Sequence, residues 1–297
     1  MKLKLGINCG FAINRYIEPE AWGRVTGEIG LHSVQFVADL LNPFLPDYYI
    51  ESQIKRIKES GKRNNFTVDS IFTSTFTRVN HLCHPDEEAR LIWLNWFKRL
   101  LDIGSRLGAK TGGGHFGILS FDTFNDPDKR KRVTEAGVKG WQELSYYAKE
   151  YGYEALIFEP MSIPREFANT VAETKAILDA VNADSGVPLK VNLDIGHAPH
   201  PDERDPYPWL LALGKVSPVI HLQQTTLGKS MHWPFTPEYN KQGHISAERV
   251  IQCLEQSGCE EALLHFELSH REHWDTDGRV VEDHRVSVEY WRQYVKD

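Results

Sequence analysis

The sequence has no long apolar run, no excess of basic residues and few cysteines. No segment of its 297 residues approaches the roughly 18 consecutive apolar residues of a membrane-spanning helix. The net charge of −7 argues against a general nucleic-acid-binding protein, which would carry a basic stripe. These absences exclude neither sugars nor small anions as ligands. They favour a protein with no nucleic-acid partner and no membrane partner, acting on a small molecule.

The four cysteines, at positions 9, 83, 253 and 259, form no CxxC pair. This spacing is typical of reduced thiols in a cytosolic protein and not of a disulfide framework. The first residues, MKLKLGINCG, have a strand pattern and lack the apolar core and cleavage site of a signal peptide. We therefore expect a cytoplasmic location.

Short β-rich runs alternate with helical segments from one end of the chain to the other. With 41% hydrophobic and 25% charged residues, the chain can bury a large core. The β-rich runs are LKLGINCGF, SVQFVADL, TVDSIFTST, AKTGGGHFG, EALIFEP, LKVNLDIGH, VIHLQQT and EALLHFELS. Several helical segments end in glycine, at Gly108, Gly152 and Gly258, which predicts left-handed helix ends. Eight strictly alternating units without a linker predict an α/β fold, a single (β/α)8 TIM barrel domain over residues 1–297.

Polar side chains end four of the predicted strands in succession. The run LKVNLDIGH stops at Asp194 and places His197 three residues later, and the neighbouring runs end at Glu159, Gln223 and Glu267. The longest loops also follow strands, and barrel active sites are built from those loops. The four strands would therefore each deliver one oxygen ligand to the same rim.

The order of these strand ends resembles a known superfamily. A strand-end Glu, then LD with His three residues on, then HLQ and then FEL is similar to the xylose isomerase-like barrels of sugar isomerases and epimerases. Within them the chain looks most like the ketose 3-epimerases. Its phrases INCGFAINRY, VQFVADLLNP, TRVNHLCHPD and HWPFTPEYN resemble the tetrulose-phosphate 3-epimerases of bacterial erythritol catabolism.

The resemblance implies roles for individual residues. Glu159, Asp194 and Glu267 would bind a divalent metal, with Glu159 and Glu267 also the catalytic acid/base pair, and His197 would contact the substrate. Relatives usually have a histidine where this chain has Gln223. His221, two residues earlier, points inward one layer deeper. We favour the Gln223 amide oxygen as the fourth ligand and leave His221 open as the alternative.

An all-oxygen ligand set suits Mg²⁺ or Mn²⁺ and offers zinc no soft ligand. The alternative, a buried polar cluster without metal, would force carboxylates to repel one another. A divalent ion would polarise a ketose carbonyl and stabilise a cis-enediolate, and two carboxylates on opposite faces could then epimerise C3. A 1,2-isomerase would instead return the proton to the neighbouring carbon, and the carboxylates alone do not decide between the two.

Further residues are candidates for substrate contacts. His115 ends the glycine-rich run GGGH, where it either touches a ligand or faces solvent at a tight turn. Arg165 and Lys229 lie in predicted rim loops, and loops after the later strands of a barrel often hold phosphate. With the resemblance, they favour a short ketose phosphate such as D-erythrulose 1-phosphate. Trp93 and Trp96 are interpreted as packing residues.

Other functions stay open at this point. A 3-epimerase of free ketoses, of the tagatose or psicose type, needs no phosphate contact. An aldose–ketose 1,2-isomerase would share the same carboxylates, and a non-enzymatic sugar-binding barrel would exchange no substrate proton. A DNA-repair endonuclease of the same superfamily would need more histidine ligands and a basic groove. A homodimer or homotetramer is compatible with the sequence.

Overall fold

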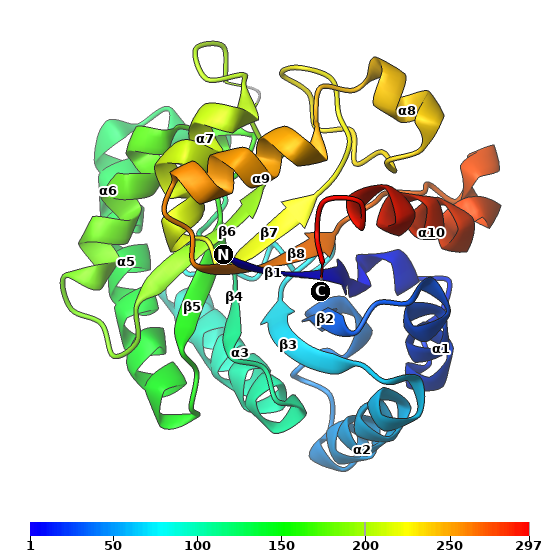
Figure 1. The fold of residues 1–297 in the computed structure, drawn as a ribbon. Helices are drawn as coiled ribbons and strands as arrows, with labels where there is room; N and C mark the ends of the chain where they lie inside the picture. The colour runs from blue at the N-terminus through cyan, green and yellow to red at the C-terminus, as the bar shows by residue number, and fades with distance from the viewer. Residues whose placement is uncertain (199, 297) are drawn as a thin grey trace. The chain divides into compact units, whose positions relative to one another are not determined.

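Eight parallel strands form a closed barrel in chain order, β1 to β8 (Figure 1). The computed structural model describes residues 1–198 and 200–296. The strands are β1 (Lys2–Asn8), β2 (Ser33–Val37), β3 (Thr67–Phe72), β4 (Thr111–His115), β5 (Ala155–Glu159), β6 (Leu189–Asp194), β7 (Val219–Leu222) and β8 (Glu261–Phe266). The predicted (β/α)8 TIM barrel is confirmed, because each strand is followed by helix before the next strand begins.

The helices alternate with the strands as the sequence predicts. The α-helices are α1 (Pro19–Ile29), α2 (Asp47–Asn64), α3 (Glu87–Leu107), α4 (Phe121–Phe124), α5 (Pro127–Glu150), α6 (Val171–Asn182), α7 (Pro206–Leu213), α8 (Pro237–Gln242), α9 (Ala247–Gln256) and α10 (Val280–Trp291). Short 3₁₀ turns are η1 (Cys9–Ala12), η2 (Ala38–Leu40), η3 (Pro164–Glu166), η4 (Gly214–Val216) and η5 (Asp275–Arg279). No helix in the described part of the chain is long and apolar enough to cross a membrane.

Local sequence signals explain where the helices begin and end. The side chain of Asp86 accepts a hydrogen bond from the backbone N–H of Ala89 at 3.1 Å and so caps the start of α3. Gly108, which ends α3, has a φ of 107°, and Gly152 and Gly258 also adopt positive φ. These left-handed glycines let the chain leave each helix and enter the next strand, as predicted.

The chain divides into two compact units. The first comprises Met1–Gln35, Lys55–Val68 and Asn192–Asp297, and the second Phe36–Ile54 and Asp69–Val191. In the first unit, α7 packs beside α9 and α1 beside α10 (Figure 1). In the second, α5 packs between α3 and α6. A single domain over residues 1–297 stays a prediction.

Aromatic residues fill the core of the second unit. Trp96 on α3 is fully buried, and its ring lies 5.2 Å from that of Phe97, which in turn contacts Trp141 at 5.9 Å. Because buried rings of this size contribute much of a core's apolar area, Trp96 has the packing role that the sequence predicts. Trp93 on the same helix is half-buried. The cysteines 9, 83, 253 and 259 are all free thiols and buried.

Candidate metal centre

The ends of three strands, all within the first unit, deliver polar side chains to one edge of the sheet. β6 ends at Asp194, and Gln223 and Glu267 directly follow β7 and β8. The strand registers pair Asp194 with His221, so the ends of parallel neighbours lie side by side. Asp194 and Gln223 are buried, and Glu267 is half-buried with 24% of its side chain exposed. The structure brings these three of the predicted strand-end residues together.

Asp194 and Gln223 are hydrogen-bonded to each other. The Gln223 amide nitrogen Nε2 donates to Asp194 Oδ1 at 2.8 Å and to Oδ2 at 3.0 Å. Oδ1 also accepts from the backbone N–H of Gly196 at 2.6 Å. Gly196 allows this approach, because a Cβ there would lie 2.2 Å from Cδ of Gln223. The Gln223 oxygen Oε1 is turned away and accepts from the backbone N–H of His232 at 2.6 Å.

His221 lies in a buried polar layer, as its strand position predicts. Its Nδ1 is 3.1 Å from Glu267 Oε2, and its Nε2 is 2.6 Å from Gln35 Oε1. Gln35 also accepts from Asn8 at 2.7 Å and donates to Asn192 at 3.1 Å. Asn8 is buried and therefore has a packing role in this layer. This layer orients His221 towards the Glu267 carboxylate.

The same edge holds two sets of residues that could bind a cation. Asp194, His221 and Glu267 each offer a ligand atom, and these atoms lie within 4.8 Å of one another. Asp194, His197 and His232 form a second such set within the same distance. His197 Nε2 lies 3.7 Å from Asp194 Oδ2, and its ring meets that of His232 edge-on at 5.6 Å. A carboxylate and imidazole cluster of this kind fits a divalent metal.

Sequence reasoning missed His232. It lies in the loop after β7, and no spacing relates it to the strand-end acids. The loop folds back on the strand end through an antiparallel bridge between Gln224 and Trp233, which places His232 beside Gln223. Only the prediction of this local fold-back could have found it in the sequence.

In the second unit, Glu159 ends β5 and is paired with His115 at the end of β4. His115 Nε2 lies 3.2 Å from Glu159 Oε2, and both side chains are buried. Thr73 Oγ1 bonds His115 Nδ1 at 3.1 Å and fixes the ring. The adjacent Gly114 permits this contact, because a Cβ there would lie 2.6 Å from Thr73 Oγ1. His115 is therefore buried and bonded rather than facing solvent, and its contact with substrate stays a prediction.

Near His115, the buried ring of His81 has an unusual titration. The pKa of His81 is lowered from 6.5 to about 4, mainly by burial and also by the neighbouring His84 and His115. Its ring lies 5.8 Å from that of His84. His81 is thus held neutral near pH 7.

The predicted rim cations differ in how they are held. Arg165 donates to the backbone oxygen of Leu119 at 2.5 Å and covers the ring of Phe121 at 4.6 Å. Lys229 lines a small pocket together with Arg204, His244 and the backbone around Gly196. Within the described part of the chain, neither Lys229 nor Arg204 forms an ion pair with a carboxylate. Of the two phosphate candidates, Lys229 is the less constrained.

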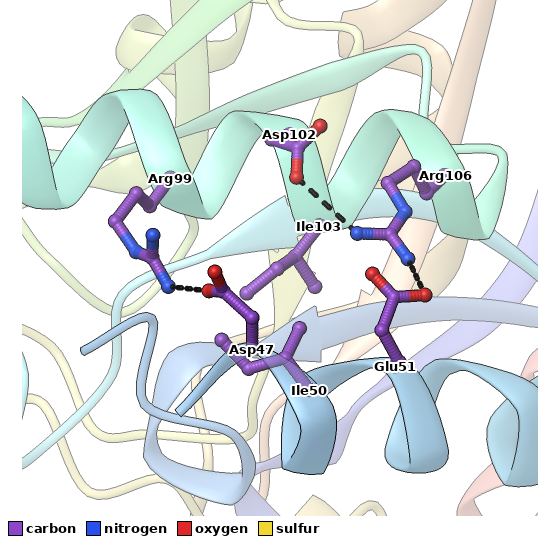
Figure 2. Close-up of a pocket in the computed structure, with 7 residues that line it drawn as sticks. All are labelled: Asp47, Ile50, Glu51, Arg99, Asp102, Ile103 and Arg106. Atoms are coloured by element: carbon purple, nitrogen blue, oxygen red, sulfur yellow. Dashed lines mark hydrogen bonds and ion pairs between the residues drawn. The ribbon is translucent and has the colours of Figure 1, made fainter. Parts of the chain in front are cut away.

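A larger pocket of about 230 Å³ lies between α2 and α3 in the second unit (Figure 2). Arg99 bonds Asp47 at 2.7 Å, and Arg106 bonds Glu51 at 2.5 Å and Asp102 at 3.4 Å. Each charge that lines this pocket is already paired with an opposite one. We therefore regard it as a surface groove stabilised by ion pairs and not as the functional site.

The chain belongs to the xylose isomerase-like TIM barrel family, whose model matches residues 24–293. It is 31% identical over 301 residues to D-erythrulose 1-phosphate 3-epimerase of Brucella abortus (strain 2308), covering 99% of this chain and 97% of that protein.

Solved structures share the fold. A putative xylose isomerase from Rhodospirillum rubrum aligns over 99% of this chain and 100% of its own, with a TM-score of 0.88 and 23% identity. D-psicose 3-epimerase from Clostridium cellulolyticum H10, solved with D-tagatose, aligns over 99% and 100%, with a TM-score of 0.75 and 16% identity. The resemblance that the sequence indicated is confirmed.

Proposed function

We propose that the protein is a metal-dependent ketose 3-epimerase, a carbohydrate isomerase like the relatives that it resembles. The observation that carries this proposal is the full-length identity of 31% to an epimerase, together with acids and imidazoles clustered at the strand ends. One relative is named as a ketose-phosphate epimerase and a solved neighbour as a ketose epimerase, which makes a small sugar or sugar phosphate the expected substrate. The further details rest on the residues themselves.

The metal would be held by the carboxylates of Glu159, Asp194 and Glu267. Asp194 and Glu267 already lie in one cluster, and Glu159 ends a strand of the same parallel barrel, whose strand ends meet at one rim. The donor set fits Mn²⁺ or Mg²⁺, because carboxylates are the preferred ligands of hard cations. For the fourth ligand, Gln223 and His221 remain the two candidates that the sequence suggests. His197 remains the expected substrate contact.

Glu159 and Glu267 would act as the two acid/base groups. When bound, the divalent cation would polarise the ketose carbonyl and stabilise the enediolate charge. One glutamate removes the C3 proton and the other returns a proton to the opposite face, which inverts C3. His115 at Glu159 and His221 at Glu267 each hold one carboxylate oxygen in position.

A short phosphorylated ketose, such as D-erythrulose 1-phosphate, is the substrate that we favour. The relative's name supplies the chemistry, and Lys229 supplies a cation in a pocket whose wall begins with Ile195 and Gly196, directly after Asp194. A phosphate there would receive charge-assisted hydrogen bonds. Arg165 stays a second candidate, although its present bonds to Leu119 and Phe121 would have to yield.

The decisive experiment assays metal-stripped and reconstituted protein on ketose 1-phosphates and on free ketoses in D₂O. We expect chelation to abolish turnover, Mn²⁺ or Mg²⁺ to restore it better than Zn²⁺, and deuterium to appear at C3 of an epimeric ketose. An aldose product that carries solvent deuterium on the carbon next to the carbonyl, instead of a ketose labelled at C3, would mean a 1,2-isomerase. Full activity without metal would refute the proposal, and turnover of free ketoses alone would refute the phosphate assignment.

A further inference from the structure

His232 occupies a backbone conformation that few side chains adopt. Its φ is +50°, in the left-handed region. For a non-glycine residue this conformation is uncommon, and such residues are often found at functional sites. The fold-back between Gln224 and Trp233, with backbone hydrogen bonds of 2.8 and 3.0 Å, brings His232 into this conformation next to the strand end.

The backbone of His232 is fixed from both sides. Its N–H donates to Gln223 Oε1 at 2.6 Å, and its carbonyl oxygen accepts from the N–H of Ser269 at 2.9 Å. These two bonds tie the loop after β7 to both β7 and the loop after β8. The backbone position from which the His232 ring projects is therefore fixed. The contacts of the two ring nitrogens then set the orientation of the ring.

The contacts of the ring define its tautomer. Nδ1 lies 3.0 Å from the backbone oxygen of Glu267, which can only accept, so Nδ1 carries the proton. Nε2 then presents a lone pair, 3.3 Å from the amide nitrogen of Gln223 and 3.1 Å from Ser230 Oγ, both of which can donate to it. A histidine whose Nδ1–H is held by a backbone carbonyl, and which offers a ligand atom within 4.8 Å of those of Asp194 and His197, has the orientation of a metal ligand.

We infer that His232 supplies a nitrogen ligand, through Nε2, to the proposed metal centre, and that Gln223 is a positioning residue rather than a ligand. This inference rests on the proposed metal-dependent function. Gln223 turns its oxygen to the His232 N–H and its amide nitrogen to Asp194, and an amide nitrogen binds no cation. Gln223 thereby clamps His232 and Asp194, which both offer ligand atoms within 4.8 Å.

The neighbouring imidazoles are engaged differently. His221 is bonded at Nε2 to Gln35 and at Nδ1 to Glu267, so it orients the carboxylate from beneath. His197 Nε2 lies 3.7 Å from Asp194 Oδ2 and stays the expected substrate contact. A mixed nitrogen and oxygen set changes the metal preference, because imidazole binds Mn²⁺ or Co²⁺ better than Mg²⁺. Metal selectivity is thus a second consequence of the same inference.

The test uses electron spin-echo envelope modulation of the full-length protein loaded with one equivalent of Mn²⁺. A coordinated imidazole nitrogen gives ¹⁴N modulation, and we expect it in the wild type. His232→Gln should abolish the modulation and raise the Mn²⁺ dissociation constant by about 100-fold. The matched variants His221→Gln and His197→Gln should keep it. Gln223→Ala should weaken Mn²⁺ binding by about 10-fold, as loss of a supporting residue does.

Each outcome of these measurements supports or overturns the assignment of His232 as a ligand. Modulation that survives in His232→Gln, or that disappears in His221→Gln or His197→Gln, overturns the assignment. One bound Mn²⁺ without ¹⁴N modulation in the wild type also overturns it while leaving the metal-dependent function intact. An active enzyme that binds no metal refutes both. If His232→Gln does not fold, His232→Ala with added imidazole replaces it. Modulation that returns only with imidazole supports the assignment, and modulation already present without imidazole refutes it.

Discussion

The strand-end cluster and the pocket between α2 and α3 are both rich in charge, but their charges are arranged in opposite ways. In the pocket, guanidinium groups bond the carboxylates of Asp47, Glu51 and Asp102 (Figure 2). In the cluster, the ligand atoms of Asp194, Glu267 and His221 all lie within 4.8 Å of one another. The negative charges of the pocket are compensated by the guanidinium groups that they bond. The acids of the cluster lie among imidazoles instead, and these groups together form a set of donors for a cation. The size of the pocket therefore does not mark the residues that we propose as the metal site.

The largest expected effect comes from changing the proposed catalytic carboxylates, compared with changing a carboxylate of the ion-paired pocket. Glu159→Gln and Glu267→Gln should each lower kcat by about 10³-fold, because general acid/base groups contribute on that order. Glu51→Gln, which alters a carboxylate of the ion-paired pocket, should leave kcat unchanged. Steady-state epimerisation at saturating Mn²⁺ measures all three. Equal losses for Glu51 and Glu267 would show that the two regions do not differ as we describe.

A second prediction tests how the buried His284 makes the stability of the folded protein depend on pH. His284 is fully buried, and burial lowers its pKa from 6.5 to about 4. The unfolded chain binds this proton as the pH falls below 6.5 but the folded protein does not, so stability is lost between pH 6.5 and about 4. The loss amounts to about 3 kcal/mol at most. Urea unfolding of the wild type and of His284→Phe across this range measures it.

His284→Phe should show a weaker pH dependence than the wild type. Some dependence should remain, because His81 has a similarly lowered pKa. Identical pH profiles for both proteins would show that His284 does not titrate as its burial indicates.

A third prediction concerns the two predicted phosphate-binding cations, Lys229 and Arg165. Lys229→Ala should lower kcat/KM for a ketose phosphate by roughly 10- to 100-fold, since a charge-assisted hydrogen bond contributes about 1.5–3 kcal/mol. The same variant should leave kcat/KM for the dephosphorylated sugar nearly unchanged. Arg165→Ala, which removes a cation already bonded to Leu119, should have the smaller effect of the two. Parallel losses on both sugars would show that Lys229 does not bind phosphate.

The smallest expected effect lies in the ion-paired pocket itself. Arg106→Ala should destabilise the protein by about 0.2–1 kcal/mol, the usual value of a partly exposed ion pair. Its guanidinium side chain is 33% exposed and bonds Glu51, which is 60% exposed. Chemical unfolding at low and high salt measures the change, and salt should reduce it. A loss of several kcal/mol would mean that this groove is a structural core after all.

Much of the fold could be predicted because it depends on local patterns. The alternating strands and helices and the strand-end positions of Glu159, Asp194, Gln223 and Glu267 follow from apolar runs and their ends. The orientation of the Gln223 amide does not, because it is set by the N–H of His232, nine residues further along the chain. His232 and Arg204 reach their positions through loop conformation, which no periodicity encodes. The strand ends were thus predictable, and the loops that complete them were not.

Gly196 makes two positions of the chain depend on each other. Any side chain there would collide with that of Gln223, whose two ends hold Asp194 and His232. Replacing Gly196 alone would therefore disturb an acid on one strand and a histidine on a distant loop at once. A smaller residue at position 223 would relieve the collision. The two positions should show strong epistasis, so that during divergence the glycine could be lost only after, or together with, the glutamine.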